Sequence, residues 1–261
     1  MTRRTAALFV GVVLSATEAR AEPRKLRWDL DADGPITLAL ATTWFTSEGL
    51  KDRLAPDACR VCGTNGVDRA VRDGLRWGDP KSADVLSNVL GYGAAPAMIG
   101  LTTVAAAGDR ALPMALVDAL LVVEAGVVAG NVSQLVKFSA GRDRPYATDQ
   151  PSSNAPANRD AHVSFYSAHT SLAFSVATAA GTVATMRGYR WAPLVWIVGV
   201  PWAFATGYLR IAADQHWFTD TLVGALTGAA IGFSLPFFFH RPQSSVRVVP
   251  MGAGAAIVGQ I

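Results

Sequence analysis

The stretch 85-VLSNVLGYGAAPAMIGLTTVAAAG-108 contains 24 residues and no charged side chain. Four more apolar runs follow it, at 112–136, 171–186, 191–209 and 221–239. A helix needs about 20 mainly apolar residues to cross the hydrocarbon core of a bilayer, and these runs are near that length. The connections between them are short and few segments have strand character. The sequence therefore predicts an all-α helical bundle with about five membrane-embedded helices.

The overall composition agrees with lipid as the surrounding medium. Only 16% of the 261 residues are charged, whereas roughly 25% are charged in an average soluble domain. The formal net charge of +3 is spread along the chain, so we expect no nucleic-acid partner. Asp118 and Glu124 interrupt the second run. Carboxylates inside membrane helices are usually functional or paired, and these two keep a soluble bundle open as an alternative.

Arginines in the connections predict an orientation across the membrane. Arg110 lies in one short connection, and Arg187 and Arg190 lie in another. Basic connections tend to stay in the cytoplasm. The opposite helix ends would then share the periplasmic side, and they carry Lys137, His169 and His216.

The N-terminus is typical of an export signal. Arg3 and Arg4 precede an uncharged run at 5–17, and the small-x-small pattern Ala19-Arg20-Ala21 follows. We expect a signal peptide at 1–21, with an uncleaved anchor as the alternative. A periplasmic or interfacial segment at 22–84, a helical core at 85–240 and a tail at 241–261 would follow. The apolar stretch 36–45 predicts an interfacial or packed helix rather than a span.

The two cysteines, Cys59 and Cys62, form the pattern Cys-Arg-Val-Cys. Two thiolates without nearby histidines do not complete a tetrahedral zinc site. The sequence leaves open a local disulfide or two idle thiols, and it predicts neither a metal nor a cofactor.

Three segments carry the residue types that phosphoryl transfer needs. They are Lys137-Phe-Ser-Ala-Gly-Arg-Asp-Arg144-Pro145, Tyr166-Ser-Ala-His169-Thr170 and Arg210-Ile-Ala-Ala-Asp-Gln-His216-Trp-Phe-Thr-Asp220. Lysine and arginine supply fixed positive charge for phosphate oxygens, and a helix start supplies N–H groups for an anion. Two histidines remain for acid–base and nucleophilic roles. Because Asp220 follows His216 by four residues, a helix would place both on one face, where the carboxylate would accept the Nδ1 proton.

These segments resemble the motifs of the type 2 phosphatidic acid phosphatase superfamily, which includes bacterial acid phosphatases and vanadium haloperoxidases. The family pattern is Lys-x6-Arg-Pro, then Pro-Ser-Gly-His, then Ser-Arg-x5-His-x3-Asp, and the resemblance covers roughly 85–239. It implies that His216 is the nucleophile, His169 the general acid and Asp220 the partner of His216. It also implies a phosphate-binding group made of Lys137, Arg144, Ser167, Ala168 and Arg210.

The sequence departs from the family pattern at three positions. Tyr166 replaces proline, Ala168 replaces glycine and Leu209 replaces serine. Alanine keeps the backbone N–H, so the phosphate cradle is retained provided that position 168 does not need a positive φ.

We therefore expect a metal-independent phosphatase in the bacterial inner membrane, with its active site facing the periplasm and a lipid phosphate or diphosphate as substrate. The alternatives are a soluble periplasmic acid phosphatase acting on small phosphate esters, a vanadate-dependent haloperoxidase, and a non-catalytic lipid-binding protein that has kept the pocket.

Overall fold

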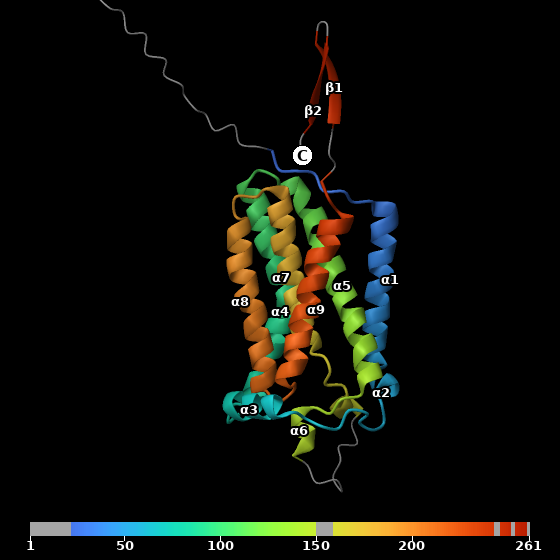
Figure 1. Cartoon of the computed structure of the whole chain (residues 1–261), viewed down its shortest axis with the longest axis vertical. Coiled ribbons are helices and arrows are strands. Elements are labelled where there is room, and N and C mark those ends of the chain that lie inside the picture. The colour runs from blue at the N-terminus through green and yellow to red at the C-terminus, as the bar shows by residue number, and fades with distance from the viewer. Residues whose placement is uncertain (1–21, 150–158, 243–245, 252–253, 260–261) are drawn as a thin grey trace, which may run out of the picture.

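The protein is an all-α bundle, seen in a computed structural model that describes residues 22–149, 159–242, 246–251 and 254–259. The predicted signal peptide lies outside the described residues. Figure 1 shows long helices side by side, with short helices at one end. The helices are α1 (Leu30–Gly49), α2 (Lys51–Leu54), α3 (Gly66–Leu75), α4 (Pro80–Gly108), α5 (Ala115–Ala140), α6 (Pro145–Thr148), α7 (Ala168–Arg187), α8 (Ala192–Ala212) and α9 (Phe218–Ser234). Short 3₁₀ segments, η1 (Leu112–Met114) and η3 (Arg159–His162), and a π-helical turn, η4 (Leu235–Phe239), complete the helical part.

The C-terminal segment is not helical. β1 (Val246–Met251) and β2 (Gly254–Gly259) pair in antiparallel fashion, with Val246 opposite Gly259. The sequence has weak β character there, and this hairpin is the exception to the helical fold among the described residues.

Helix α7 forms the centre of the bundle and packs against α4, α5, α8 and α9. Small residues make this close packing feasible. A Cβ on Gly228 of α9 would overlap the carbonyl oxygen of Ser171, and one on Gly232 would overlap that of Ser175. The Ser175 hydroxyl donates 2.9 Å to the Ala125 carbonyl of α5, so this hydroxyl of α7 is satisfied by a neighbouring helix.

All five predicted long helices exist, but only four of the described helices are long and apolar enough to cross a membrane. Those four segments are Pro80–Gly108, Leu112–Ala140, Ala192–Ala212 and Phe218–Phe239. The fifth, α7, is rich in serine, threonine and alanine, and almost its whole length is buried by the other helices. The predicted all-α bundle is confirmed, and of its about five expected membrane-embedded helices four have the length and hydropathy of a span, while α7 lies at the centre among them.

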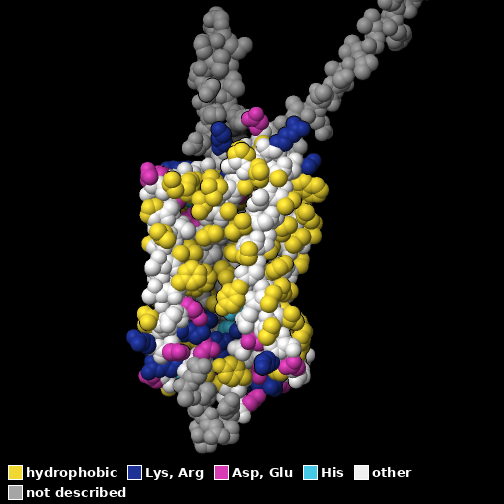
Figure 2. Space-filling model, turned by 180° about the vertical axis from the view of Figure 1, so that it is seen from behind, with side chains coloured by type: hydrophobic (Ala, Val, Ile, Leu, Met, Phe, Trp, Pro, Cys, Tyr) yellow, Lys and Arg dark blue, Asp and Glu magenta, His cyan; other side chains and the backbone are white. Residues whose placement is uncertain are grey.

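The outer surface of these four helices is apolar. Large side chains such as Val89, Leu135, Ile197 and Leu226 are more than half exposed. Figure 2 shows an apolar belt, with charged side chains gathered at the two ends of the bundle. An exposed apolar belt of this extent is the reverse of a soluble surface, and it places the protein in a membrane.

The two carboxylates of the second apolar run are both paired. Asp118 Oδ1 accepts from Arg187 Nε at 2.8 Å, and its Oδ2 accepts from the Tyr189 hydroxyl at 2.7 Å. Glu124 Oε2 lies 3.1 Å from His240 Nε2. Pairing lowers the cost of placing a carboxylate at membrane depth.

Candidate active site

A cavity of about 600 Å³ lies at the bundle end where α5 ends and α7 begins. Six of the eight predicted site residues line it, namely Lys137, Arg144, Ala168, His169, Arg210 and His216. The three sequence motifs therefore converge on one space, as their placement at helix ends predicted. The other two predicted residues, Ser167 and Asp220, lie behind the lining.

The helix ends at this cavity have local causes in the sequence. Gly141 ends α5 with φ 57°, a left-handed conformation that favours glycine. The chain turns there, just beyond Lys137, and Arg144 N then donates 2.8 Å to the Ala161 carbonyl. This turn brings the lysine and the arginine of the first motif to the same cavity.

Arg144 is the most highly bonded cation of the site. Its Nε donates to the Asp160 carbonyl at 2.9 Å, and its Nη1 lies 3.1 Å from Gln215 Oε1 and 3.3 Å from His216 Nε2. Since the guanidinium is only 3% exposed, these bonds fix its plane. Arg144 is thus held against the imidazole that the resemblance implies is the nucleophile.

Arg210 is held from α4, which the motifs did not predict. Its Nη1 donates to Asp84 Oδ1 at 2.8 Å and to Ser87 Oγ at 2.9 Å, while its buried Nε has no hydrogen-bond partner among the described residues. Lys137 is 6% exposed and has no carboxylate within ion-pair distance among those residues. Both side chains thus have N–H donors available to an anion in the cavity.

His216 is fully buried, and both of its ring nitrogens are placed. Nδ1 lies 2.7 Å from the Ser164 carbonyl oxygen, which only accepts, so Nδ1 carries the proton and Nε2 carries the lone pair. Burial, together with the cations Arg144, Arg210 and Lys137, holds the pKa of His216 well below its ordinary value. The ring is therefore neutral at neutral pH, as a nucleophile requires.

The predicted bond between His216 and Asp220 is corrected by the structure. His216 precedes the N-cap of α9, Trp217, so the two residues are not on one helix, and Nδ1 lies 3.7 Å from Asp220 Oδ2. The carboxylate instead accepts from Ser164 Oγ at 2.5 Å and from Arg142 Nη1 at 2.5 Å. Asp220 thus fixes the residue whose carbonyl holds His216.

This network extends beyond the motifs. Arg142 Nη2 donates 2.7 Å to Asp68 of α3, and Asp68 also accepts from Thr219 N at 2.9 Å. Asp68 is fully buried. A helix from the N-terminal segment therefore supports the segments that carry His216 and Asp220.

His169 stands across the cavity at the start of α7. Its ring contacts Tyr92 edge to face at 4.9 Å between centroids, and its buried Nε2 has no hydrogen-bond partner among the described residues. Gly91 of α4 makes room for this ring, since a Cβ there would lie 2.4 Å from His169 Cδ2. The imidazole is thus positioned by packing, with one nitrogen free for proton transfer.

Ser167 does not face the cavity. Its hydroxyl is buried as the N-cap of α7, where it lies 2.9 Å from Thr170 Oγ1 and accepts from Thr170 N at 3.4 Å. Ala168 does line the cavity, in helical conformation and without a positive φ. Alanine therefore fits at the position where the family has glycine.

Sequence reasoning missed four charged residues of the cavity, which are Glu48, Lys51, Asp84 and Asp160. Lys51 Nζ lies 2.6 Å from Asp160 Oδ1 and 3.2 Å from Glu48 Oε1. Although burial opposes it, the neighbouring Arg144 and Lys51 keep the pKa of Asp160 below its ordinary value. None of them belongs to a motif, and the sequence gave no local signal for them.

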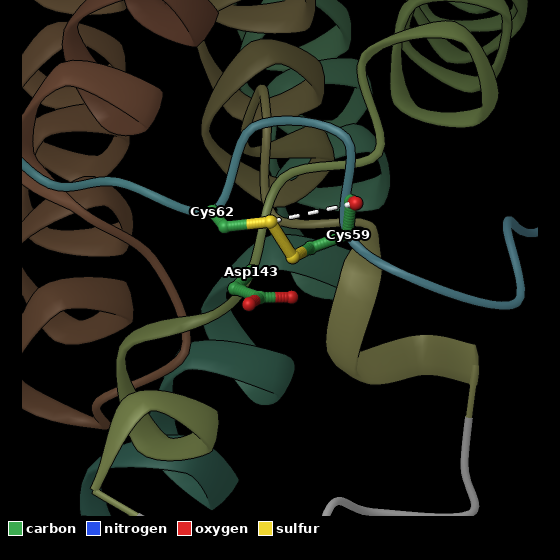
Figure 3. A group of neighbouring side chains, drawn as sticks. All are labelled: Cys59, Cys62 and Asp143. Carbon is green, nitrogen blue, oxygen red and sulfur yellow. Dashed lines mark hydrogen bonds between the residues drawn. A yellow bond between two sulfur atoms is a disulfide. The ribbon is translucent and has the colours of Figure 1, made fainter. Parts of the chain in front are cut away.

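The cysteine pair forms a disulfide beside the first motif. Figure 3 shows the bonded sulfurs of Cys59 and Cys62 with the Asp143 carboxylate next to them. Because thiolates, not disulfide sulfurs, bind metals, this group is not a metal site while the bond exists. The loop between the cysteines contacts the motif, since Arg60 N donates 2.8 Å to the Gly141 carbonyl.

Comparison with known proteins agrees with this site. Residues 115–243 match the family model described as the PAP2 superfamily. Phospholipid phosphatase 2 of Rattus norvegicus is 29% identical over 148 residues, which are 46% of this chain and 54% of the relative. The Mus musculus protein of the same name is 29% identical over 143 residues, which are 44% of this chain and 52% of the relative. The chain spans about half the length of the curated relatives it matches.

A solved structure also aligns with the chain. It is the first transmembrane PAP2 type phosphatidylglycerolphosphate phosphatase from Bacillus subtilis, with a TM-score of 0.49, 17% identity and coverage of 77% of this chain and 94% of that chain.

Proposed function

We propose, for a chain that belongs to the PAP2 superfamily over residues 115–243, that the cavity is the active site of a membrane phosphatase acting on a lipid phosphate or diphosphate. The observation that carries the proposal is the placement of His216. Its unprotonated Nε2 lies beside Arg144, in a cavity that Lys137 and Arg210 also line.

The lining of the cavity supports an amphiphilic substrate. Charged groups cover one part, and aromatic and aliphatic side chains cover the rest, among them Trp44, Phe45, Val127 and Leu172. A phosphate headgroup fits the first part and a hydrocarbon chain fits the second. A small polar ester would leave the apolar part of the cavity unused.

The reaction proceeds in two displacements. His216 Nε2 attacks phosphorus, the bond from phosphorus to the leaving oxygen breaks, and His169 gives that oxygen a proton. Water then attacks the phosphohistidine, His169 takes a proton from that water, the bond from phosphorus to Nε2 breaks, and inorganic phosphate leaves. Lys137, Arg144 and Arg210 counter the charge on the equatorial oxygens in both steps.

The periplasmic orientation of this site is part of the proposal. Arg110 lies between α4 and α5, and Arg190 lies between α7 and α8. Both connections are at the bundle end opposite the cavity, and basic connections favour the cytoplasm. Labelling of single cysteines introduced at these connections in intact cells would contradict the orientation if the connections reacted with an impermeant reagent.

The test of the function is phosphate release from a panel of lipid phosphates by the purified protein and by His216→Ala. Loss of the nucleophile is expected to lower kcat by about 10³-fold or more. His240→Ala, at the opposite end of the bundle, is the matched control and should retain activity. Activity of wild type should persist in EDTA. Retention of more than a few per cent of turnover by His216→Ala would contradict the mechanism.

A further inference from the structure

Lys51 brings a fourth cation to the cavity from outside the residues that match the PAP2 family. It begins α2, directly after α1, whereas the family match starts at residue 115. The side chain is about one quarter exposed and lines the same cavity as His216. The three motif cations already line the cavity that holds His216, so Lys51 calls for a separate explanation.

The carboxylate of Asp160 marks an anion position between Lys51 and Arg144. Asp160 Oδ1 lies 2.6 Å from Lys51 Nζ, and it accepts from Arg144 Nη2 at 3.2 Å. Carboxylate and phosphate oxygens are recognised by the same donors. A substrate anion can therefore replace the carboxylate on these two cations.

Arg144 joins this anion position to the reacting centre. Its Nη2 faces Asp160, while its Nη1 lies 3.3 Å from His216 Nε2, where the transferred phosphorus must sit. One guanidinium thus borders two adjacent anion positions. Two phosphates linked through one oxygen are adjacent in the same way. A monophosphate would occupy the reacting centre beside His216 and leave the position between Lys51 and Arg144 without a phosphate.

The surroundings of Lys51 hold it in place before a substrate arrives. Glu48, its second partner at 3.2 Å, also accepts from Gln134 Nε2 of α5 at 2.5 Å. Arg159, the neighbour of Asp160, donates 3.2 Å to the Arg53 carbonyl of α2. Contacts other than the Lys51–Asp160 pair therefore hold α2, which carries Lys51, against the segment that carries Asp160.

We infer that Lys51 binds the second phosphate of a lipid diphosphate, displacing Asp160, and so selects diphosphates over monophosphates. The inference rests on the proposed phosphatase function. The terminal phosphoryl group moves to His216 Nε2, the bond to the bridging oxygen breaks, and His169 protonates that oxygen. The leaving group is a lipid monophosphate whose remaining phosphate lies between Lys51 and Arg144.

The test compares farnesyl diphosphate with farnesyl monophosphate, which differ by one phosphate on the same chain. For Lys51→Met we expect kcat/KM for the diphosphate to fall about 10- to 100-fold, the range for loss of a charged hydrogen bond. The value for the monophosphate should stay within about twofold. Lys51→Arg should retain most of the diphosphate activity, and Arg53→Met removes an exposed charge from the same helix as a control.

The monophosphate reaction reports whether each variant is folded. An equal loss on both substrates, or no loss on either, would overturn the assignment of Lys51 while leaving the phosphatase function intact. Failure of wild type on both substrates and on the lipid panel would overturn the proposed function itself. Asp160→Asn supplies a second measurement, because weakening the competing carboxylate should lower KM for the diphosphate, and a raised KM would count against the displacement.

Discussion

The two ends of the bundle bury charge in different ways. At the end away from the cavity, Asp118 is bonded to both Arg187 and Tyr189, and every oxygen of the carboxylate has a donor. At the cavity end, Lys137 lies buried without a carboxylate in ion-pair distance, and Arg210 Nε and His169 Nε2 have no hydrogen-bond partner, among the described residues.

The difference indicates two uses of buried charge in one fold. A paired set such as Asp118 and Arg187 joins α5 to α7 and is complete without a ligand. Cations that remain unpaired are costly to bury, and they become favourable when a phosphate enters. The Asp118–Arg187 pair should therefore respond to mutation mainly in stability, and the unpaired residues of the cavity mainly in activity.

Asp118→Ala is expected to have the largest effect on stability. It leaves the guanidinium of Arg187 buried without a counter-charge, which typically costs about 3–5 kcal/mol. Thermal and denaturant unfolding in detergent should show the loss. The double variant Asp118→Ala with Arg187→Met should recover part of it, since no unpaired charge remains. Equal stability of the single variant and wild type would contradict the structural role of the pair.

Lys137→Met is expected to show the opposite behaviour. Removal of a cation that stabilises the transition state should lower kcat/KM by about 10²- to 10³-fold. The midpoint of unfolding should stay the same or rise, because an unpaired buried charge is gone. Parallel assays of turnover and unfolding measure both. A large loss of stability with little loss of turnover would place Lys137 with the structural charges.

Asp220→Asn tests the network that replaces the predicted histidine–carboxylate bond. The Ser164 carbonyl would still hold His216 Nδ1, so we expect kcat to fall about 10- to 100-fold, as for loss of one charged hydrogen bond. Where a carboxylate bonds the catalytic histidine directly, the loss is about 10⁴-fold. A loss of that size here would indicate that Asp220 bonds His216 directly and would contradict the indirect network.

The sequence predicted the long helices well, because uncharged runs near membrane length have few other folds available. It also predicted that Lys137, His169 and His216 share one end of the bundle. Successive helices run in opposite directions, so the order of the helices determines which helix ends lie on the same side. What it did not predict depends on contacts between distant segments. Asp84 on Arg210, Asp68 on Arg142 and Lys51 on Asp160 have no fixed spacing in the chain.

Local spacing was misleading for the bond between His216 and Asp220, and the Ser167 hydroxyl has a helix-capping contact that its motif did not indicate. The four-residue interval between His216 and Asp220 predicted a shared helical face, but α9 starts only after Trp217. Ser167 was assigned to phosphate by its motif, yet its hydroxyl caps α7. In both cases the helix start, which sequence locates poorly, decided where the side chain points.

The smallest expected effect is on the pH dependence of activity and stability, through His216 and the cations beside it. Burial and the nearby cations lower the pKa of His216, so the ring should stay unprotonated, and kcat/KM should persist, below the ordinary imidazole value of about 6.5. The unfolded chain binds that proton first, so the His216 contribution makes the free energy of unfolding fall as pH drops below about 6.5. Lys137→Met removes one of these cations, so the pKa of His216 should rise. As the pH is lowered, the residual kcat/KM of this variant should therefore begin to fall at a higher pH than that of wild type. Because the substrate ionises identically in both assays, a shift between the two profiles belongs to the enzyme, and coincident acid limbs would show that Lys137 does not act on His216.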